Sequence, residues 1–422
     1  MECGLRIPVF LHALVLFPNL SDADRRKIIH TIYEHAWLIS RRLSLYSSLG
    51  NHTICECMGL IFASLLFRST GEGREWLEKG IHLLDTEISH QILDDGGPAE
   101  QSMNYHRFVL DLYWMVVGLL EKNDLYDCLA WKQRLLRGET FMAAFTDRQG
   151  NIPSIGDSDD GHAIAPGLMP ERPTVVVDEK TYQSFPAAGY TIIRGRSKTR
   201  MIFDHGPLGM APLYNHGHAD ALSIILYKEE TPLLIDPGTY RYNGVPQWRE
   251  YFKSTRAHNT VTIDGLDQAV QETGFIWSRP YSVDGYAAHE AASGVDVQAR
   301  HNGYSRIRHP VWHKRAISID HNRYTIVDTF EGSGVHDYEL NFHLHPDAVA
   351  FSNGSEWVID NSHVTCTIAL KDGSEFRHFK GQIEPILGWF SPAYGVKRET
   401  TVLSCWKRGR PEGVSFLTEI TV

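Results

Sequence analysis

Residues 151–170 read NIPSIGDSDDGHAIAPGLMP, and the hydrophobic period of the chain changes across this stretch. Before it, apolar residues recur at helical spacing, whereas after it short runs rich in β-branched residues alternate with turns. The stretch itself is rich in Gly, Pro and Asp, which favour turns and loops. We therefore predict a linker here, between a helical domain over residues 1–165 and a β-rich domain over residues 166–422.

The segment before this linker has the pattern of consecutive helices. Ser21 is a predicted N-cap, and Asp22 and Asp24 follow it in the first turn, where carboxylates interact favourably with the helix dipole. Gly50 is expected to end this helix. Short links between antiparallel helices are typical of bundles, solenoids and toroids. Further helices are predicted over about 7–17, 52–67, 73–93, 103–121 and 124–145.

The segment after the linker alternates with a period of two, as half-buried strands do. This pattern continues to Val422 and predicts a large antiparallel β-sandwich, either as one body or as two subdomains with a break near residue 345. The predicted fold class is therefore multidomain α+β. Examples of the β-rich runs are 191–194, 201–203, 222–227, 260–263 and 324–328.

The composition limits the partners of the chain. Its 422 residues carry a net charge of −10, which argues against a nucleic-acid partner and would repel a polyanion at long range. An acidic substrate would therefore need a local basic groove. No apolar run reaches the ~20 residues that a membrane span requires. The apolar run over residues 7–17 follows Glu2 and has no small-residue cleavage site after it, so we recognise no signal peptide. The six cysteines fit no disulfide or zinc-knuckle spacing, so buried thiols are predicted.

The helical domain carries a polar group at the start of a predicted helix, formed by Asn51, His52 and Glu56. Residues 52 and 56 are four apart and share a helix face, so the carboxylate could hold the imidazole in one tautomer. The alternative is an N-cap Asn followed by a surface His–Glu pair.

A further polar group, Glu100-Gln-Ser-Met-Asn-Tyr105-His106-Arg107, follows the Gly-Gly-Pro turn. Tyr105 and His106 offer proton carriers, and Arg107 offers a cation that could bind a carboxylate. The alternative is that Tyr105 is a half-buried helix aromatic.

The β-rich domain contains His216-Gly-His218-Ala-Asp220. In an extended segment, residues two apart point the same way, so these three side chains can face one site. Asp236 ends an apolar run further on, and His258 follows it. Two imidazoles and a carboxylate are typical zinc ligands, so a metal site is one interpretation. The other is a set of strand-end histidines with a turn-forming Asp-Pro-Gly.

Cations and aromatic side chains alternate just after Asp236. Such a mixture suits sugar rings and carboxylates, although a solvated polar loop is the alternative. His343 and His345 also share a face, and we expect a packing or edge role for them. The members of the mixed stretch are Tyr240, Arg241, Tyr242, Trp248, Arg249, Tyr251, Lys253 and Arg256.

Together, these residues resemble the heparinase II/III-like polysaccharide lyases, whose members act on heparin, heparan sulfate, alginate and related uronate polymers. The resemblance runs through most of the chain and rests on the order and spacing of its motifs. These are Gly-Asn51-His52 with Glu56, Glu100-Gln-Ser-x-x-Tyr105-His106, Gly156-Asp-Ser-Asp-Asp-Gly161, Asn215-His-Gly-His-Ala-Asp220, Asp236-Pro-Gly and His258-Asn-Thr-Val.

The resemblance implies an (α/α) toroid followed by an antiparallel β-sandwich, with the substrate in a cleft between them. The chain has fewer predicted helices than the toroids of the family, so we expect an incomplete toroid and a shortened N-terminus. The family also implies a periplasmic or secreted location.

The resemblance further implies a role for each motif. Asn51 and His52 match the pair that neutralises the uronate carboxylate, Tyr105 the proton carrier, and His216 the catalytic histidine. Asp220 is expected to support the metal ligands, and either Tyr240 or Tyr242 to lie near the leaving group. The residues matching the ligands of a structural zinc near the active site are His218, Asp236 and His258. The predicted substrate-binding residues are Glu56, Glu100, His106, Arg107, Tyr240, Tyr242, Arg249 and Arg256.

The predicted function is cleavage of a uronate-containing acidic polysaccharide by β-elimination, which leaves an unsaturated uronate. A zinc-dependent glycan hydrolase is one alternative, because three protein ligands leave a coordination position open for water. A catalytically inactive protein that binds glycans or accompanies exopolysaccharide is another.

Overall fold

A computed structural model describes residues 1–46, 48–163, 165, 169–176, 180–195, 198–291 and 294–422. The chain forms two compact units. The helical unit comprises Met1–Ala99, Tyr105–Phe141 and Gly161–Val176, and the β-rich unit comprises Glu100–Asn104, Met142–Asp160 and Val177–Val422. The boundary predicted at residue 165 adjoins residues 164 and 166–168, which lie outside the described residues.

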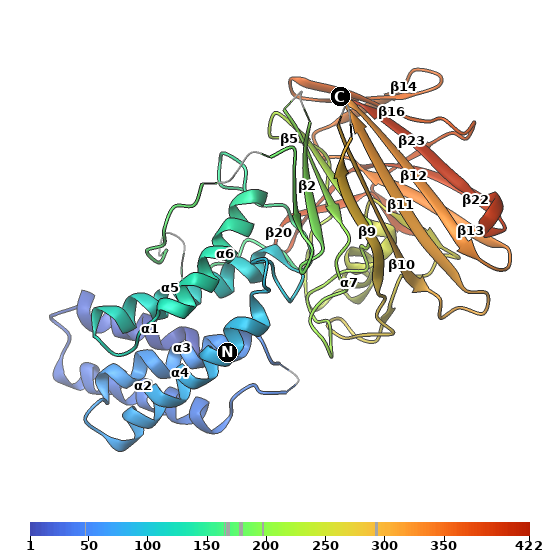
Figure 1. The fold of residues 1–422 in the computed structure, drawn as a ribbon. Helices are drawn as coiled ribbons and strands as arrows, with labels where there is room; N and C mark the ends of the chain where they lie inside the picture. Colours follow the sequence, from blue (N-terminus) through green and yellow to red (C-terminus); the bar gives the residue numbers. More distant parts are fainter. Residues whose placement is uncertain (47, 164, 166–168, 177–179, 196–197, 292–293) are drawn as a thin grey trace. The chain divides into compact units, whose positions relative to one another are not determined.

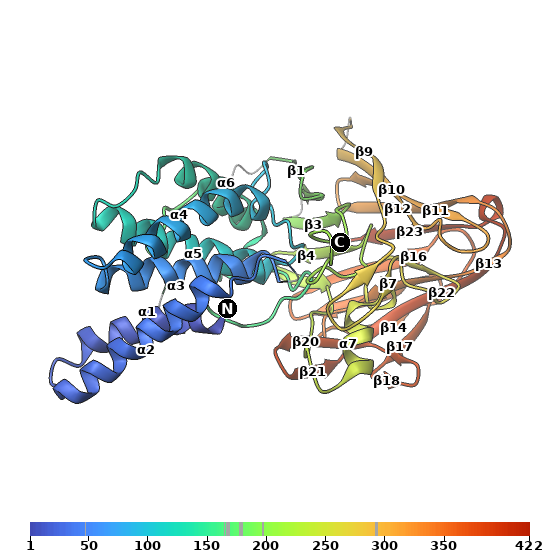
Figure 2. The same ribbon diagram turned by 90° about the horizontal axis from the view of Figure 1, so that it is seen from below.

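The helical unit is built from consecutive helices, as the apolar spacing predicts (Figures 1 and 2). Within the described residues, none of these helices combines the length and the apolar character that crossing a membrane requires. The helices are α1 (Glu2–Leu16), α2 (Asp22–Arg41), α3 (Asn51–Leu66), α4 (Gly71–Gln91), α5 (Met103–Lys122) and α6 (Leu129–Phe145).

Helix α3 lies at the centre of its neighbours, and nearly all of its residues are buried. Such burial requires apolar side chains around the whole helix, and the α3 sequence NHTICECMGLIFASLL supplies them. Glycines allow α1 to approach it closely, because a Cβ atom on Gly59 would lie 2.6 Å from the Cα of Gly4. The cysteines of α3, Cys55 and Cys57, are buried free thiols, as predicted.

Helix α2 begins as the sequence predicts and ends earlier than predicted. The Ser21 hydroxyl accepts a hydrogen bond from the backbone N–H of Asp24 at 3.1 Å. The helix ends at Arg41 and not at Gly50, so that prediction was wrong. The chain leaves the helix because the backbone N–H and the hydroxyl of Ser44 both donate to the carboxylate of Glu56, at 2.7 and 2.8 Å.

The β-rich unit consists of antiparallel sheets, and strands β9 to β12 and β23 run side by side in Figure 1. A five-stranded sheet has the order β1 (Tyr182–Phe185), β2 (Tyr190–Gly195), β3 (Thr199–Asp204), β4 (Ile224–Lys228), β5 (Thr231–Leu234). An eight-stranded sheet has the order β14 (Val349–Ser352), β15 (Trp357–Asn361), β16 (Val364–Leu370), β23 (Ser415–Thr421), β12 (Arg323–Gly332), β11 (Val311–Asp320), β10 (Gly294–Tyr304), β9 (Val283–Glu290).

Shorter elements complete this unit. A four-stranded sheet has the order β17 (Arg377–Lys380), β22 (Thr401–Gly409), β13 (His336–His343), β6 (Val261–Ile263). The two-stranded sheets are β7 (Val270–Gln271) with β8 (Trp277–Ser278), β18 (Gln382–Ile383) with β19 (Ile386–Leu387), and β20 (Trp389–Ala393) with β21 (Val396–Glu399). The helical segments are α7 (Pro246–Lys253) and the 3₁₀ turns η1 (Thr255–Ala257) and η2 (Pro411–Gly413).

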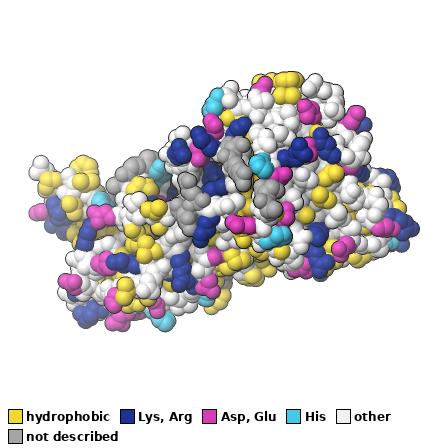
Figure 3. All heavy atoms as spheres, turned by 45° about the horizontal axis from the view of Figure 1, so that its top comes forward, with side chains coloured by type: hydrophobic (Ala, Val, Ile, Leu, Met, Phe, Trp, Pro, Cys, Tyr) yellow, Lys and Arg dark blue, Asp and Glu magenta, His cyan; other side chains and the backbone are white. Residues whose placement is uncertain are grey.

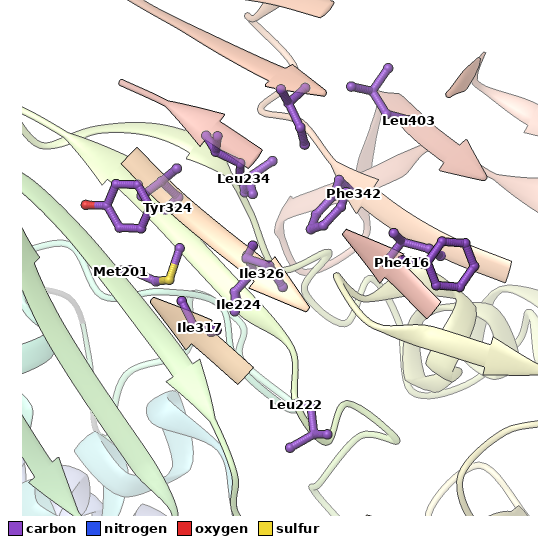
Figure 4. Close-up of a cluster of buried hydrophobic side chains, with 14 of the residues drawn as sticks. Met201, Leu222, Ile224, Leu234, Ile317, Tyr324, Ile326, Phe342, Leu403 and Phe416 are labelled. Atoms are coloured by element: carbon purple, nitrogen blue, oxygen red, sulfur yellow. The ribbon is translucent and has the colours of Figure 1, made fainter. Parts of the chain in front are cut away.

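The core of the β-rich unit is shared by its larger sheets. Along β10 and β11, buried residues alternate with more exposed ones, which matches the predicted period of two. Their buried faces meet residues of the other sheets in one apolar cluster. Figure 4 shows members from the five-stranded sheet (Met201, Ile224), the eight-stranded sheet (Ile317, Ile326) and the four-stranded sheet (Phe342). This shared core is typical of a layered β-sandwich.

Candidate functional site

The predicted carboxylate-neutralising residues lie at the start of α3 in the helical unit. Gly50 precedes the helix with a φ of 107°, a conformation that favours glycine. Asn51 is buried, and His52 is half-buried. Glu56 is also buried, with its carboxylate accepting from Ser44. The described contacts of Glu56 therefore secure the segment before α3, and its predicted roles toward His52 and substrate stay predictions.

Tyr105, His106 and Arg107 lie on the first turns of α5, where successive side chains point in different directions. Tyr105 and Arg107 are half-buried. His106 is 2% exposed, and its ring meets the edge of Phe141 with ring centres 5.5 Å apart. Burial lowers the pKa of His106 to about 3, so its ring is neutral at pH 7. This burial favours a packing role over the substrate contact that the sequence predicts.

The segment His216–Asp220 lies in the β-rich unit, where its histidines meet a buried carboxylate from an earlier loop. The carboxylate of Asp157 contacts Nδ1 of His216 and Nε2 of His218, each at 3.1 Å. The hydroxyl of Thr239 donates to the same carboxylate at 2.8 Å, and Nη2 of Arg249 does so at 2.7 Å. We call these five residues the Asp157 cluster.

The charge of Asp157 fixes the protonation of both imidazoles. Burial alone would raise its pKa, but the Arg249 guanidinium and the hydrogen bonds from His216 and His218 hold that pKa well below its usual value. An ionised carboxylate only accepts hydrogen bonds, so each histidine must direct an N–H at it. His216 therefore directs its Nδ1–H at the carboxylate and His218 its Nε2–H, and the lowered pKa of His218 leaves its Nδ1 unprotonated.

The loop that carries Asp157 is held close to His216. The backbone N–H of Asp157 donates to the carbonyl of His216 at 2.9 Å. Gly156 has a φ of 64°, and a Cβ atom on it would lie 2.2 Å from the carbonyl oxygen of Gln101. A side chain at position 156 would therefore displace this loop and, with it, the carboxylate.

The predicted zinc ligands come together in the same unit. One possible ligand atom each from His218, Asp236 and His258 lies within 4.8 Å of the others, and all of these residues are buried. Nδ1 of His258 contacts the carboxylate of Asp236 at 3.1 Å. Nδ1 of His218 and Nε2 of His258 are buried without a hydrogen-bond partner in the described part of the chain. Buried imidazole nitrogens without partners beside a carboxylate fit a zinc ion, so the residues present suit the group that the sequence predicts.

Asp220 is buried beside this set and not within it. Its pKa is raised well above the usual value, first by burial and then by the nearby carboxylates of Asp204 and Asp236. Burial likewise raises the pKa of Asp204 to about 8. The predicted support of the metal ligands by Asp220 stays a prediction.

The predicted substrate-binding cations are already engaged within the β-rich unit. Arg249 is 2% exposed, and besides Asp157 it binds the hydroxyl of Thr239 at 2.7 Å and the carbonyl of Gly274 at 2.8 Å. Arg249 therefore holds Asp157 in place, and its predicted contact with substrate stays a prediction. Nε of Arg256 donates to the carboxylate of Glu339 at 2.8 Å. Glu100, which belongs to this unit, is 5% exposed.

The surroundings of Tyr240 and Tyr242 differ. The Tyr240 ring packs among aromatic side chains, with the ring centre of Phe252 5.8 Å away. The hydroxyl of Tyr242 donates to the carboxylate of Asp159 at 3.1 Å. Phe275 packs against both Tyr242 and His216, with ring centres 5.5 and 6.4 Å from theirs. The structure thus places Tyr242 near His216.

His343 and His345 follow the packing role that we expected. His343 is buried, and its Nε2 donates a hydrogen bond to the carbonyl of Arg256 at 3.1 Å. Burial lowers its pKa to about 3. His345 is partly buried and lies 3.7 Å from the carboxylate of Asp347.

The sequence drew attention to the loop Gly156–Gly161 but assigned no role to its acids. Asp157 is the centre of the cluster, and Asp159 holds Tyr242. Thr239 and Phe275 also escaped prediction. A role for these acids could have been predicted from their place in a loop with a glycine at each end, between the helical and the β-rich parts of the chain. Such loops often carry functional residues.

Comparison with known proteins covers both parts of the chain. The family profile "Heparinase II/III N-terminus" matches residues 1–165, and "Heparinase II/III-like, C-terminal" matches residues 178–414. A heparin-sulfate lyase of Bacteroides stercoris is 22% identical over 440 residues, which span 96% of this chain and 61% of that protein. A heparin-sulfate lyase of Pedobacter heparinus is 22% identical over 290 residues, or 63% of this chain and 43% of that protein.

Solved structures share the fold. A crystal structure of heparinase III superimposes with a TM-score of 0.79 at 16% identity, covering 99% of this chain and 68% of that one. A heparan sulfate lyase from Pedobacter heparinus gives a TM-score of 0.71 at 17% identity, covering 100% of this chain and 67% of that one. This likeness confirms the predicted fold class of a helical toroid-type region followed by a large antiparallel β-sheet region. The chain spans about three fifths of the length of the Bacteroides stercoris relative.

Proposed function

Because the chain belongs to the heparinase II/III-like family, we propose that it is a polysaccharide lyase acting on a uronate-containing acidic polysaccharide. The observation that carries this proposal is the Asp157 cluster, in which one buried carboxylate sets the tautomer of His216. A histidine with a fixed acceptor nitrogen suits proton transfer at neutral pH. The names of the relatives, heparin-sulfate lyases, favour a glycosaminoglycan as the substrate class.

In β-elimination, a base removes the proton on C5 of a uronate. The electron pair of that C–H bond forms the C4–C5 double bond, and the C4–O bond breaks as its oxygen leaves with a proton from an acid. The C5 proton is weakly acidic unless the adjacent carboxylate is neutralised, because negative charge builds on that group. We assign this neutralisation to Asn51 and His52, in accordance with their match to the family motif.

Tyr105 and His216 are the proposed acid and base. Nε2 of His216 can take a proton, and the imidazolium would then be stabilised by Asp157 on the opposite side of the ring. A tyrosine has an ordinary pKa of about 10, so Tyr105 acts as a base only where cations favour its phenolate. Which group serves as the acid depends on the configuration of the uronate at C5. Tyr242 is the proposed further hydroxyl near the leaving group, because it shares Phe275 with His216.

We also propose that His218, Asp236 and His258 hold a structural zinc ion. When bound, zinc would supply positive charge in a buried place and join segments that are distant in the sequence. The unpartnered nitrogens of His218 and His258 support this assignment.

The proposal is tested by incubating the purified chain with heparan sulfate, chondroitin, hyaluronan and alginate. A lyase releases products with an unsaturated uronate, which absorbs ultraviolet light. Tyr105→Phe and His216→Ala should each abolish product formation while the circular dichroism spectrum is retained. The matched control Tyr126→Phe removes a hydroxyl from another half-buried tyrosine of the helical unit and should leave turnover unchanged.

The alternative functions give different results. A zinc-dependent hydrolase would yield saturated products and lose turnover when a chelator removes the metal. A glycan-binding protein would retain the polymers without forming any product. Normal turnover by both Tyr105→Phe and His216→Ala would refute the proposed acid and base.

A further inference from the structure

The β-rich unit contains a pocket of 560 Å³ that the proposed reaction does not use. It lies where β2 ends and β3 begins, beside the end of β9 and the start of β10. Its described lining includes the charged residues Arg148, Lys180, Arg194, Lys198, Arg200, Glu230 and Glu290. We call it the basic pocket.

The charge of the basic pocket is opposite to that of the whole chain. Among the described residues that line it, five are lysine or arginine and two are glutamate, although the net charge of the chain is −10. Figure 3 shows that Lys and Arg side chains gather in groups on one face of the molecule. A concave surface lined by one sign of charge concentrates ions of the opposite sign. The basic pocket thus meets the need for a local positive surface that the net charge imposes on any acidic substrate.

Arg200 is the fixed cation of the pocket. Its side chain is 12% exposed, and its Nη1 donates to the carbonyl of Phe145 at 2.7 Å. The guanidinium also lies over the ring of Tyr227, 4.5 Å from its centre. Its Nε is buried and has no hydrogen-bond acceptor among the described residues, and Nη2 reaches Glu230 only at 3.4 Å. The guanidinium of Arg200 is therefore held in place at the pocket, with a single long contact to an acidic side chain.

Arg148 and Lys198 supply adaptable charge at the same pocket. Both are exposed, and in the described chain neither lies within 4.0 Å of a carboxylate. Long side chains of this kind can move to meet an anionic group that enters. A guanidinium held in place, together with free cations at the rim, is an arrangement that binds carboxylate or sulfate.

The basic pocket is separate from the Asp157 cluster within the same unit. One end of β3, at Thr199, lines the basic pocket. The other end, at Asp204, lies close to the carboxylates of Asp220 and Asp236. Five residues along a strand span about 17 Å. A ligand that reaches both places must therefore be long and carry anionic groups at intervals, as an acidic polysaccharide does.

We infer that the basic pocket is a remote subsite that binds a carboxylate or sulfate group of an acidic glycan chain. This inference rests on the proposed function for the identity of the glycan. Free inorganic sulfate or phosphate shares the same chemistry, so the experiment must separate these sources.

The test compares charge reversals at matched positions. The pocket variant combines Arg148→Glu with Lys198→Glu. The control variant combines Arg410→Glu with Lys380→Glu, which are exposed residues of the same unit outside the pocket, so both variants change the net charge equally. Each protein is eluted from immobilised heparin with a salt gradient, and its KM is measured on a heparan sulfate polymer and on a short oligosaccharide.

The pocket variant should elute at lower salt than the control and show a KM for the polymer raised about 3–10-fold, as expected for the loss of exposed ion contacts. Its kcat, and its KM for the short oligosaccharide, should stay at the control values. Equal elution and equal KM for both variants would overturn the subsite. If inorganic sulfate stabilises the wild type against heat and the polymer KM is unchanged, the pocket binds free anions and the glycan assignment is wrong. If the wild type turns over none of the polymers, the proposed function is wrong. The elution of the two variants from heparin then still decides whether the basic pocket binds an acidic glycan.

Discussion

Asp157→Asn is the substitution whose effect can be worked out most directly from the structure. It keeps the size of the side chain and removes its charge. The carboxylate is fully buried and binds the Arg249 guanidinium as well as His216 and His218. One side of the asparagine carboxamide is an NH₂ group, which can only donate. Because the groups that face the Asp157 carboxylate in the wild type are also donors, this NH₂ group would face no acceptor. The variant therefore leaves Arg249 charged, buried and without its counter-ion.

Breaking a buried ion pair by removing one partner costs about 3–5 kcal/mol. The Asp157 cluster belongs in this range because Arg249 is 2% exposed and cannot turn to solvent without unpacking. For a domain of this size, each kcal/mol lowers the melting temperature by about 2 °C, so we expect a decrease of about 6–10 °C. Loss of the hydrogen bond to His218 should also weaken the proposed zinc binding by about 10–100-fold.

The pH dependence follows from the lowered pKa of Asp157. A depressed carboxylate pKa contributes stability above the unfolded value of about 3.9, and this contribution is lost as the pH falls through the folded-state value. The difference between wild type and Asp157→Asn should therefore be full at pH 7 and shrink below about pH 4. Thermal unfolding, followed by near-ultraviolet circular dichroism from pH 7 to pH 3, measures it.

Asp160→Asn is the matched control, because Asp160 is an exposed acid of the same loop. It should change stability by less than about 1 kcal/mol. The reasoning is refuted if Asp157→Asn is as stable as Asp160→Asn at pH 7, since Arg249 would then not depend on this carboxylate.

Further substitutions test the same unit. Lys253 is fully buried over the ring of Trp277, and burial lowers its pKa to about 7. Because burying this amine is costly, Lys253→Met should raise the free energy of unfolding, measured in urea at pH 7, by about 1–3 kcal/mol. This gain should shrink toward pH 10, because the unfolded lysine then also loses its proton. His218→Ala should lower both zinc content and melting temperature, and an unchanged zinc content, measured by atomic absorption, would contradict the metal assignment. Asp328→Asn should lower the free energy of unfolding by about 3–5 kcal/mol in the same urea assay, because it leaves the buried guanidinium of Arg315 without its counter-ion.

The fold was predictable because hydrophobic periodicity depends on local geometry. Helices α3 to α6 and strands such as β2, β3 and β12 lie where the spacing of apolar residues places them. The early end of α2 was not predictable, since Ser44 leaves the helix for a carboxylate on α3 that is distant in the sequence. A contact between separate elements overrides local propensity and has no local signal.

The candidate metal ligands were predictable for a different reason. The resemblance implied His218, Asp236 and His258 as ligands, and of these Asp236 directly ends an apolar run. Arg249 was assigned to substrate because its sequence surroundings, rich in aromatic side chains, are those of a sugar-binding surface. The fold shows that the guanidinium of Arg249 binds the carboxylate of Asp157, which lies in a loop distant in the sequence.

The pairing of Arg249 with Asp157 explains how two buried histidines can be oriented inside a protein. A lone buried carboxylate would be protonated, and it would then no longer accept from both imidazoles. With Arg249 beside it, the carboxylate stays ionised while the Asp157 cluster has no net charge, which reduces the cost of its burial. A proton taken up by His216 would make the cluster positive, and the same carboxylate would stabilise that charge directly. Arg249 is therefore engaged by the carboxylate on which the orientation of His216 depends, and the basic pocket is a separate source of positive charge for the proposed glycan substrate.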